Sequence, residues 1–447
     1  MRMSSNSIES AEHLSATHDN LFEMRLNGVL AVESRTDWSA FALFVSLALI
    51  VVAFVPLAPP VDVIEGGGVT ARGGIEFGLI LIGVVTLATY AKASQSVSFE
   101  LKSPAFVIVS LFVFWAVMSS IWSPNPFLTI AKSAELWLVA FAAAMSAAIA
   151  ARSHSSRSRI EVILAMSLIA VIVGLIIANL YIWGTPLPNT GDVTLPLELL
   201  DEEASPERPR LILAYAHPLL TGDLISLSMI CVFAASMRKV WKTILIPGLF
   251  VLLLLADARG PTGGVIIAMI AMTVVKFRRN DVRAVAVMLI ISVILAVALV
   301  LNDSLLRMSS LLMTDDVSTL NSRTELWKQA FAYIVESPIA GCGYYASRYL
   351  LIKNFPWAGH AHNSFIETLL TTGLIGFTML IGFMAYLARV VLKTGNVLLL
   401  GTTIYCLIQG MLNPLLFYAG LPMFVIMISV LSAYRQGLDA TDTGLLS

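Results

Sequence analysis

Residues 359–388 read GHAHNSFIETLLTTGLIGFTMLIGFMAYLA and place a polar group of side chains in front of a long apolar run. The polar group contains two histidines, an amide and a carboxylate, namely His360, His362, Asn363 and Glu367. The run behind it has the length of about 20 residues that a helix needs to cross a bilayer. Titratable side chains are costly at a membrane helix and commonly serve function there. This stretch therefore predicts a membrane helix with a functional site at its N-terminal end.

The composition of the whole chain is that of an integral membrane protein. Hydrophobic residues make up 57% of the 447 residues and charged residues only 13%, against about 25% charged in soluble domains. The mean hydropathy is +0.84. The net charge of −1 gives no indication of nucleic-acid binding. The three cysteines, Cys231, Cys342 and Cys406, are scattered and predict neither a disulfide framework nor a metal site.

Apolar runs of membrane-spanning character recur along the chain. They predict an all-α integral membrane protein with about 12 transmembrane helices, of which the seventh, eighth and twelfth are short. The first 38 residues are polar, and the first apolar run leads into Pro59-Pro60 rather than a cleavage site, so it is predicted to be a retained anchor. The predicted spans cover residues 39–58, 75–91, 104–122, 134–151, 162–183, 211–236, 243–256, 264–277, 284–301, 363–388, 396–416 and 420–434.

The distribution of Lys and Arg predicts the orientation of these helices. If the N-terminus is inside, the inner loops hold most of the basic residues, as the positive-inside rule requires. Both termini are then cytoplasmic. The predicted organisation is a tail at 1–38, helices 1–9 within 39–301, a large periplasmic loop at 302–362, helices 10–12 within 363–434, and a tail at 435–447.

The large loop carries its own helical pattern. Ser322 and Glu325 have the spacing of a capping box, which predicts a helix start. The Ser337-Pro338 pair predicts its end. Such a helix is expected to lie along the outer membrane surface. Its apolar residues at helical spacing are Leu326, Trp327, Ala330, Phe331 and Ile334.

Three arginines, Arg208, Arg210 and Arg259, fall at outer ends of predicted helices, against the trend of the other basic residues. One interpretation makes them interfacial anchors whose charged ends reach the lipid head groups. The other makes them a pocket for a polyanion, because guanidinium binds phosphate through paired hydrogen bonds. The sequence pattern leaves both open.

The histidines are interpreted as acid–base groups. His360 and His362 have a spacing found in metal sites, but no further ligand accompanies them in the loop, so no metal is predicted. One of them as a general base near neutral pH fits better. Ser364 and Glu367 form a second capping-box pattern, which would hold His362 at a helix N-terminus. Glu367 either caps this helix or orients a substrate hydroxyl.

Three stretches carry a resemblance to a known family. His362-Asn363 with Glu367 and then Gly373 to Gly376 keeps ten residues between His362 and Gly373. The others are the run from Arg323 through Leu326-Trp327 and Ser337-Pro338-Ile339 to Gly341-Cys342-Gly343, and the turn Ala258-Arg259-Gly260. Here the chain resembles the O-antigen ligase and O-antigen/exopolysaccharide polymerase superfamily, over residues 105 to 383. Two departures, Ala258 for serine and Gly263 for leucine, change packing more than chemistry.

The resemblance implies a GT-C-like fold and a metal-independent, inverting glycosyltransferase without cofactors. Its donor would be an undecaprenyl-pyrophosphate-linked oligosaccharide, and its acceptor a sugar hydroxyl on the periplasmic side of the bacterial inner membrane. His362 would be the base, with Arg210 and Arg259 at the pyrophosphate and Arg208 helping. Arg323 would touch the sugar or phosphate, although capping and surface roles fit it equally. His360, Asn363 and Glu367 complete the expected substrate-binding set.

Two further questions remain open at this level. The acceptor can be another lipid-linked glycan, which makes the protein a polymerase, or the lipid A-core, which makes it a ligase. The compact outer loops favour the polymerase slightly. A transporter or flippase is the competing class, since it would also have many spans, but transporters place polar groups at the membrane midplane. Here the polar groups gather at the outer helix ends.

Overall fold

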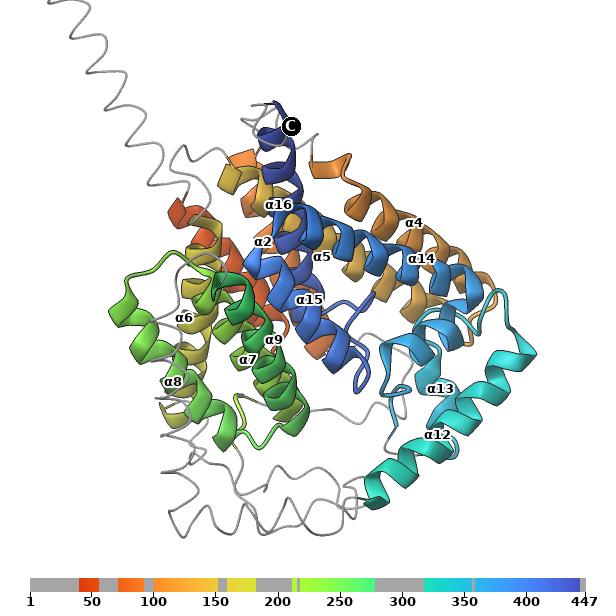
Figure 1. The fold of residues 1–447 in the computed structure, drawn as a ribbon. Helices are drawn as coiled ribbons and strands as arrows, with labels where there is room; N and C mark the ends of the chain where they lie inside the picture. Colours follow the sequence, from red (N-terminus) through yellow and green to blue (C-terminus); the bar gives the residue numbers. More distant parts are fainter. Residues whose placement is uncertain are drawn as a thin grey trace, which may run out of the picture.

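The computed structural model describes residues 40–55, 71–91, 100–151, 159–181, 211–214, 218–277, 317–355 and 358–442. This part of the chain is all-helical (Figure 1), so the predicted fold class is confirmed for it. Both predicted tails, the predicted span at 284–301, and Arg208 and Arg210 lie outside these residues, except for the first residues of the C-terminal tail. The predicted periplasmic loop is described only from Val317 onward.

Helices occupy every predicted span that falls within the described residues, and four of them are long and apolar enough to cross a membrane. These four are Pro104–Ile121, Pro126–Ala151, Ile160–Tyr181 and Ser364–Thr394. The number of twelve spans stays a prediction. The helices are Ala40–Ala53, α2 (Ala71–Ala91), α4 (Pro104–Met118) with a 3-10 turn (Ser119–Ile121), α5 (Pro126–Ala151), α6 (Arg159–Tyr181), α7 (Pro218–Ala234), α8 (Lys239–Leu255), α9 (Arg259–Phe277), α12 (Val317–Glu336), α13 (Ser347–Leu351), α14 (Ser364–Thr394), α15 (Val397–Gly410) and α16 (Leu421–Asp442).

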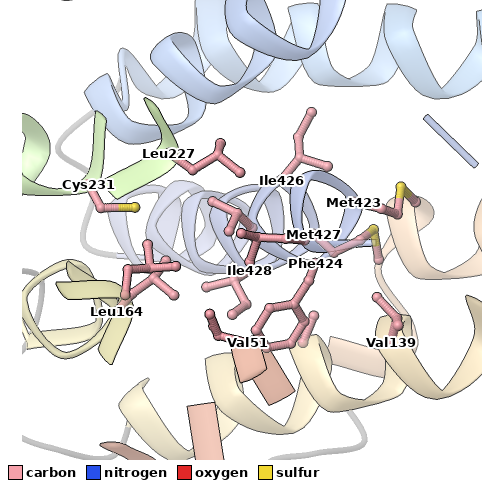
Figure 2. Close-up of a cluster of buried hydrophobic side chains, with 14 of the residues drawn as sticks. Val51, Val139, Leu164, Leu227, Cys231, Met423, Phe424, Ile426, Met427 and Ile428 are labelled. Carbon is pink, nitrogen blue, oxygen red and sulfur yellow. The ribbon is translucent and has the colours of Figure 1, made fainter. Parts of the chain in front are cut away.

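Helix α16 stands at the centre of the bundle. From Leu421 to Leu431 every residue is buried, so the helix has no exposed face in this stretch. A helix that is apolar all round is expected to be surrounded by others. Figure 2 shows Phe424, Ile426, Met427 and Ile428 of α16 among Val51, Val139, Leu164, Leu227 and Cys231 from other helices.

Helix α5 packs closely beside α16 because its side chains there are small. Its C-terminal half is rich in alanine, and Ala142, Ala143 and Ala144 are completely buried. Apolar burial gives little drive between helices in lipid, so close backbone approach through small residues is the usual source of association. The alanine run thus explains why α5 is an inner helix.

Helix α14 is kinked at Gly373, which has φ 65° and ψ −165°. The connector after α12 is inserted at this point and takes over the helix's backbone hydrogen bonds. Leu374 N–H donates to Pro338 O (2.9 Å), and Cys342 N–H donates to Leu370 O (2.9 Å). Such an insertion into the hydrogen-bond ladder is a known cause of sharp kinks. The kink therefore joins the predicted outer loop firmly to a membrane helix.

The structure corrects two details of the predicted outer helix. Helix α12 begins at Val317, so Ser322 lies within it and does not cap its start. It ends at Glu336, just before Ser337-Pro338, as predicted. The predicted apolar face is also divided: Leu326 and Ala330 are buried, whereas Phe331 is 48% exposed. The reason is that only a narrow stripe of α12 meets the neighbouring helices.

Replacing Gly373 with alanine is expected to lower the free energy of unfolding by about 2 kcal/mol or more. The added Cβ would overlap the backbone of Ile339 and lie 2.6 Å from Gly341 N, and the backbone conformation is one that only glycine adopts readily. Gly382→Ala on the same helix is the matched control, because nothing lies within 4 Å of its added Cβ. Thermal unfolding in detergent measures both variants, and equal midpoints would contradict the expectation.

Candidate active site

The loop before α14 is held by the backbone of Ala361, the residue between the two histidines. Ala361 N–H donates to Glu367 Oε2 (2.8 Å), and Ala361 O accepts from Trp327 Nε1–H (2.9 Å). Ala361 itself is completely buried. Both backbone groups of Ala361 are thus bound, so the backbone between His360 and His362 is held in place.

Glu367 holds this loop from behind and does not cap the helix. It is 3% exposed, and its second oxygen, Oε1, accepts from Ser347 Oγ (2.5 Å). The cap is Asn363, whose Oδ1 accepts from Phe365 N–H (2.9 Å). The predicted capping box of Ser364 and Glu367 is therefore wrong, because the helix cap lies one residue earlier and leaves Glu367 one position too far along to reach back to it.

The two imidazoles lie close to each other. Their ring centroids are 4.2 Å apart, and His362 N–H donates to His360 Nδ1 (3.2 Å). His360 is thus an acceptor at Nδ1, so its neutral form carries the proton at Nε2. His362 has φ 50°, a left-handed conformation that is uncommon for a residue with a side chain. Backbone strain of this kind occurs at functional sites, where the surrounding contacts maintain it.

Arg259 is the first residue of α9 and is exposed. The turn before it is tight, with Asp257 at φ 47°, and it packs against α7, where a Cβ added to Gly222 would meet Ala258 at 2.5 Å. On the other side, a Cβ added to Gly260 would lie 2.7 Å from Gln409 Oε1. The Arg259 turn is therefore packed between α7 and the end of α15, as the predicted short connection between two apolar helices requires.

The end of α15 lies between the Arg259 turn and the loop at residues 358–363 before α14, here called the histidine loop. Asn363 Nδ2 donates to Met411 O (3.2 Å), and Ser364 Oγ donates to Asn413 O (2.9 Å). Residues 409–413 thus contact the start of α9 on one side and the start of α14 on the other. The Arg259 turn and the segment with His360, His362, Asn363 and Glu367 therefore pack against the same short stretch at the end of α15.

Arg323 is placed beside this group through α12. It is half-buried and precedes Trp327 by four residues, so the two side chains leave neighbouring turns of one helix face. Trp327 is the residue that binds Ala361. Arg323 therefore stands on the side of α12 that faces the histidine loop, whereas Arg208 and Arg210 belong to the part of the chain outside the described residues.

A buried polar group under the Arg259 turn was missed by the sequence analysis. Asp223 of α7 is 3% exposed, and its Oδ1 accepts from Tyr405 OH (2.5 Å) and Gln409 Nε2 (3.4 Å). The signal was available, since a lone carboxylate within an apolar run is costly unless something uses it. Ser347 was also missed, and nothing in its sequence surroundings marks it. Asp223 holds Tyr405 and Gln409 next to the Arg259 turn, and Ser347 holds Glu367 next to the loop before α14.

No group of three or more His, Cys, Asp and Glu side chains in the described part of the chain is arranged to hold a metal ion. The two segments that pack against the end of α15 supply imidazole side chains, at His360 and His362, and a guanidinium, at Arg259. Such a pair can remove a proton from one reactant and stabilise negative charge on another.

Replacing Trp327 with phenylalanine is expected to lower activity more than stability. Phenylalanine keeps most of the apolar packing but loses the indole N–H that binds Ala361 O, a hydrogen bond with a net contribution of about 1 kcal/mol. The histidine loop would then lose one of its two fixed points. Turnover and thermal unfolding are compared with Trp137→Phe, whose side chain stacks on Phe141 away from the loop. Equal turnover in the two variants would exclude this role for Trp327.

Comparison with known proteins agrees with the sequence motifs. A sequence model of the O-antigen ligase family matches residues 225–381, a region that includes the Arg259 turn, the described part of the outer loop and the histidine loop. A search of curated proteins finds no match. Residues 225–381 thus match the O-antigen ligase family, and this match supports the O-antigen ligase-related superfamily that the motifs predicted.

Proposed function

We propose that this protein is a metal-independent, inverting glycosyltransferase of the bacterial inner membrane. It transfers an oligosaccharide from undecaprenyl pyrophosphate to an acceptor sugar hydroxyl on the periplasmic face, with both termini in the cytoplasm. The observation that carries the proposal is the position of His362. The two backbone hydrogen bonds of Ala361 fix its loop, and this loop and the Arg259 turn both pack against the end of α15. The match to the O-antigen ligase family supports the same chemistry.

His362 accepts the proton of the acceptor hydroxyl in this mechanism. The hydroxyl oxygen attacks the anomeric carbon of the donor from the face opposite the leaving group. The bond from that carbon to the pyrophosphate oxygen breaks, and undecaprenyl pyrophosphate leaves with the bonding electrons, so the anomeric configuration inverts. A base contributes only if it lies within hydrogen-bonding distance of the proton it accepts. The contacts of Ala361 and Asn363 supply that positioning.

Arg259 binds the pyrophosphate and stabilises the charge that develops on it as it leaves. Its place at the first position of α9 adds a second favourable interaction, because the N-terminus of a helix attracts anions. Arg210, with Arg208, supplies further positive charge from the segment before α7. Arg323, His360, Asn363 and Glu367 complete the site, Glu367 and Asn363 by holding the loop and His360 by accepting from His362 N–H.

The acceptor distinguishes a polymerase from a ligase, and we slightly favour a polymerase of surface polysaccharide because the sequence predicts compact outer loops. The alternative is a ligase that transfers the glycan to lipid A-core. A transporter or flippase is the second alternative. The described polar site argues against it, since its members gather at one end of the helices.

The product of the purified protein tests these alternatives. The protein in EDTA receives lipid-pyrophosphate-linked oligosaccharide with and without a lipid A-core acceptor. Lengthened lipid-linked chains identify a polymerase, and glycosylated core identifies a ligase. No product from any donor, together with transbilayer movement of the lipid-linked glycan in vesicles, would replace the proposal with transport.

A further inference from the structure

The exposed face of α12 changes character along the helix. Near its middle it exposes an ion pair, Glu325 Oε1 to Lys328 Nζ at 2.5 Å, with both side chains more than half exposed. Its last two turns and the turn after the helix expose three large apolar side chains, Phe331 at 48%, Val335 at 77% and Ile339 at 63%. Phe331 and Val335 are four residues apart on one helix face, and Ile339 follows just after the helix end; the three are here called the α12 stripe.

The α12 stripe is not the packing face of the helix. Leu326, Ala330 and Ile334 on another side are buried in a cluster with Leu351 and Leu370. Helix α12 is therefore already packed against the protein through this buried side, and the α12 stripe remains exposed when it is so packed. A second apolar face on a docked helix needs a second apolar partner.

The end of α12 is tied to α14 at the level where α14 becomes a membrane helix. Leu374 N–H donates to Pro338 O (2.9 Å), and Leu374 is itself 48% exposed. Before this point α14 is mostly buried and carries Ser, Glu and Thr side chains. After it the exposed residues up to Arg389 are apolar except Thr378, whose hydroxyl donates to Ile375 O within the helix. The part from Leu374 to Thr394 measures about 32 Å at 1.5 Å per residue, close to the ~30 Å hydrocarbon thickness.

The apolar exposure continues from this connector to α4. Trp122 Nε1–H donates to Gly341 O (3.1 Å), and Trp122 and Ile121 are 38% and 75% exposed at the end of the membrane helix that contains α4. Tryptophan is enriched where a membrane helix meets the head groups. The connector that follows the α12 stripe is therefore bonded to α14 and to the end of the α4 segment, both of which expose apolar side chains there.

We propose that α12 from Phe331 to its end is immersed in the outer interfacial layer of the bilayer, with the α12 stripe against lipid, while the Glu325–Lys328 segment rises into water. The occupant of the stripe is lipid, namely acyl chains and the adjoining head groups. Part of the segment predicted as a periplasmic loop is then a membrane contact. Because Trp327 on the same helix binds Ala361, the depth of α12 in the bilayer then fixes the distance of the histidine loop from the membrane surface.

Spin labels test the depth of the helix. Single cysteines replace Val335, Ile339 and, as the matched control on the same exposed side, Lys328, in a chain whose three native cysteines are changed to alanine. Each nitroxide is measured in lipid nanodiscs for collision with oxygen and with a water-soluble nickel chelate. We expect oxygen to dominate at Val335→Cys and Ile339→Cys and the nickel chelate to dominate at Lys328→Cys.

Two results would overturn the proposal. Dominant collision with the nickel chelate at Val335→Cys means that the stripe faces water. Weak collision with both reagents means that protein, such as a second copy of the chain, covers it. If the cysteine-free chain does not fold, wild-type protein with a diazirine phospholipid gives the same answer, since cross-links must fall on Phe331–Ile339 and spare Thr324–Lys328. Neither readout depends on glycosyl transfer, so failure here leaves the proposed function untouched.

Discussion

His362→Ala is expected to lower the rate of glycosyl transfer by about 10²–10⁴-fold, the usual contribution of a general base. The loop that carries His362 is held through Ala361 and Asn363, which bind Glu367, Trp327 and Met411, so the variant should still fold. Single-turnover transfer from the lipid-linked donor measures the effect in EDTA, where a metal-independent wild type keeps its rate.

His154→Ala is the control for loss of a histidine, because His154 belongs to a predicted cytoplasmic loop. Its rate should equal that of the wild type. A His362→Ala variant that folds normally and transfers glycan at the wild-type rate would remove His362 from the mechanism. His360→Ala distinguishes the roles of the two histidines. It removes only the acceptor for the His362 backbone N–H, so it should lower the transfer rate less than loss of the base does.

Arg259→Ala is expected to lower transfer by about 10²–10³-fold, the loss seen when one group that stabilises developing negative charge is removed. Arg259→Lys should recover only part of the rate, because an ammonium cannot form the paired hydrogen bonds that guanidinium makes with phosphate. The exposed position of Arg259 at the start of α9 predicts little change in thermal stability. Transfer rates at saturating and at low donor concentration measure the effect.

Arg389→Ala is the matched control, since Arg389 is an exposed arginine at the other end of α14. It should transfer at the wild-type rate. If Arg259→Ala and Arg389→Ala behave alike, Arg259 is an interfacial anchor, which is the other interpretation that its sequence position allowed.

The membrane class, the positions of the helices and the start of α14 next to His362 were predictable from the sequence. Each depends on a local pattern: apolar runs of sufficient length, a turn between two such runs at Arg259, and an amide or hydroxyl residue before a helix. The errors were also local. The cap was assigned to Ser364 instead of Asn363, and the start of α12 to Ser322 instead of Val317, because hydroxyl residues near a helix start offer more than one possible cap.

The contacts that arrange the candidate site were not predictable, because each joins residues far apart in the chain. Ser347 binds Glu367, Trp327 binds Ala361, and the connector after α12 enters the kink of α14 at Gly373. A sequence shows that Glu367 is a carboxylate near a helix start, but its partners depend on which segments pack beside that helix. Only the folded chain shows that one of its oxygens binds the loop at Ala361 and the other binds Ser347 of α13.

The sequence by itself determined a helical membrane protein that resembles the O-antigen ligase-related superfamily, with histidines and an arginine at helix ends. Those features follow from the spacing of apolar and polar residues, which is a local property of the chain. The tertiary structure decided that the Arg259 turn and the loop with His362 both pack against the end of α15, that Glu367 supports this loop, and that α12 has a second apolar face. These depend on the packing of separate helices, and the free energy of that packing is distributed over contacts that no local pattern contains.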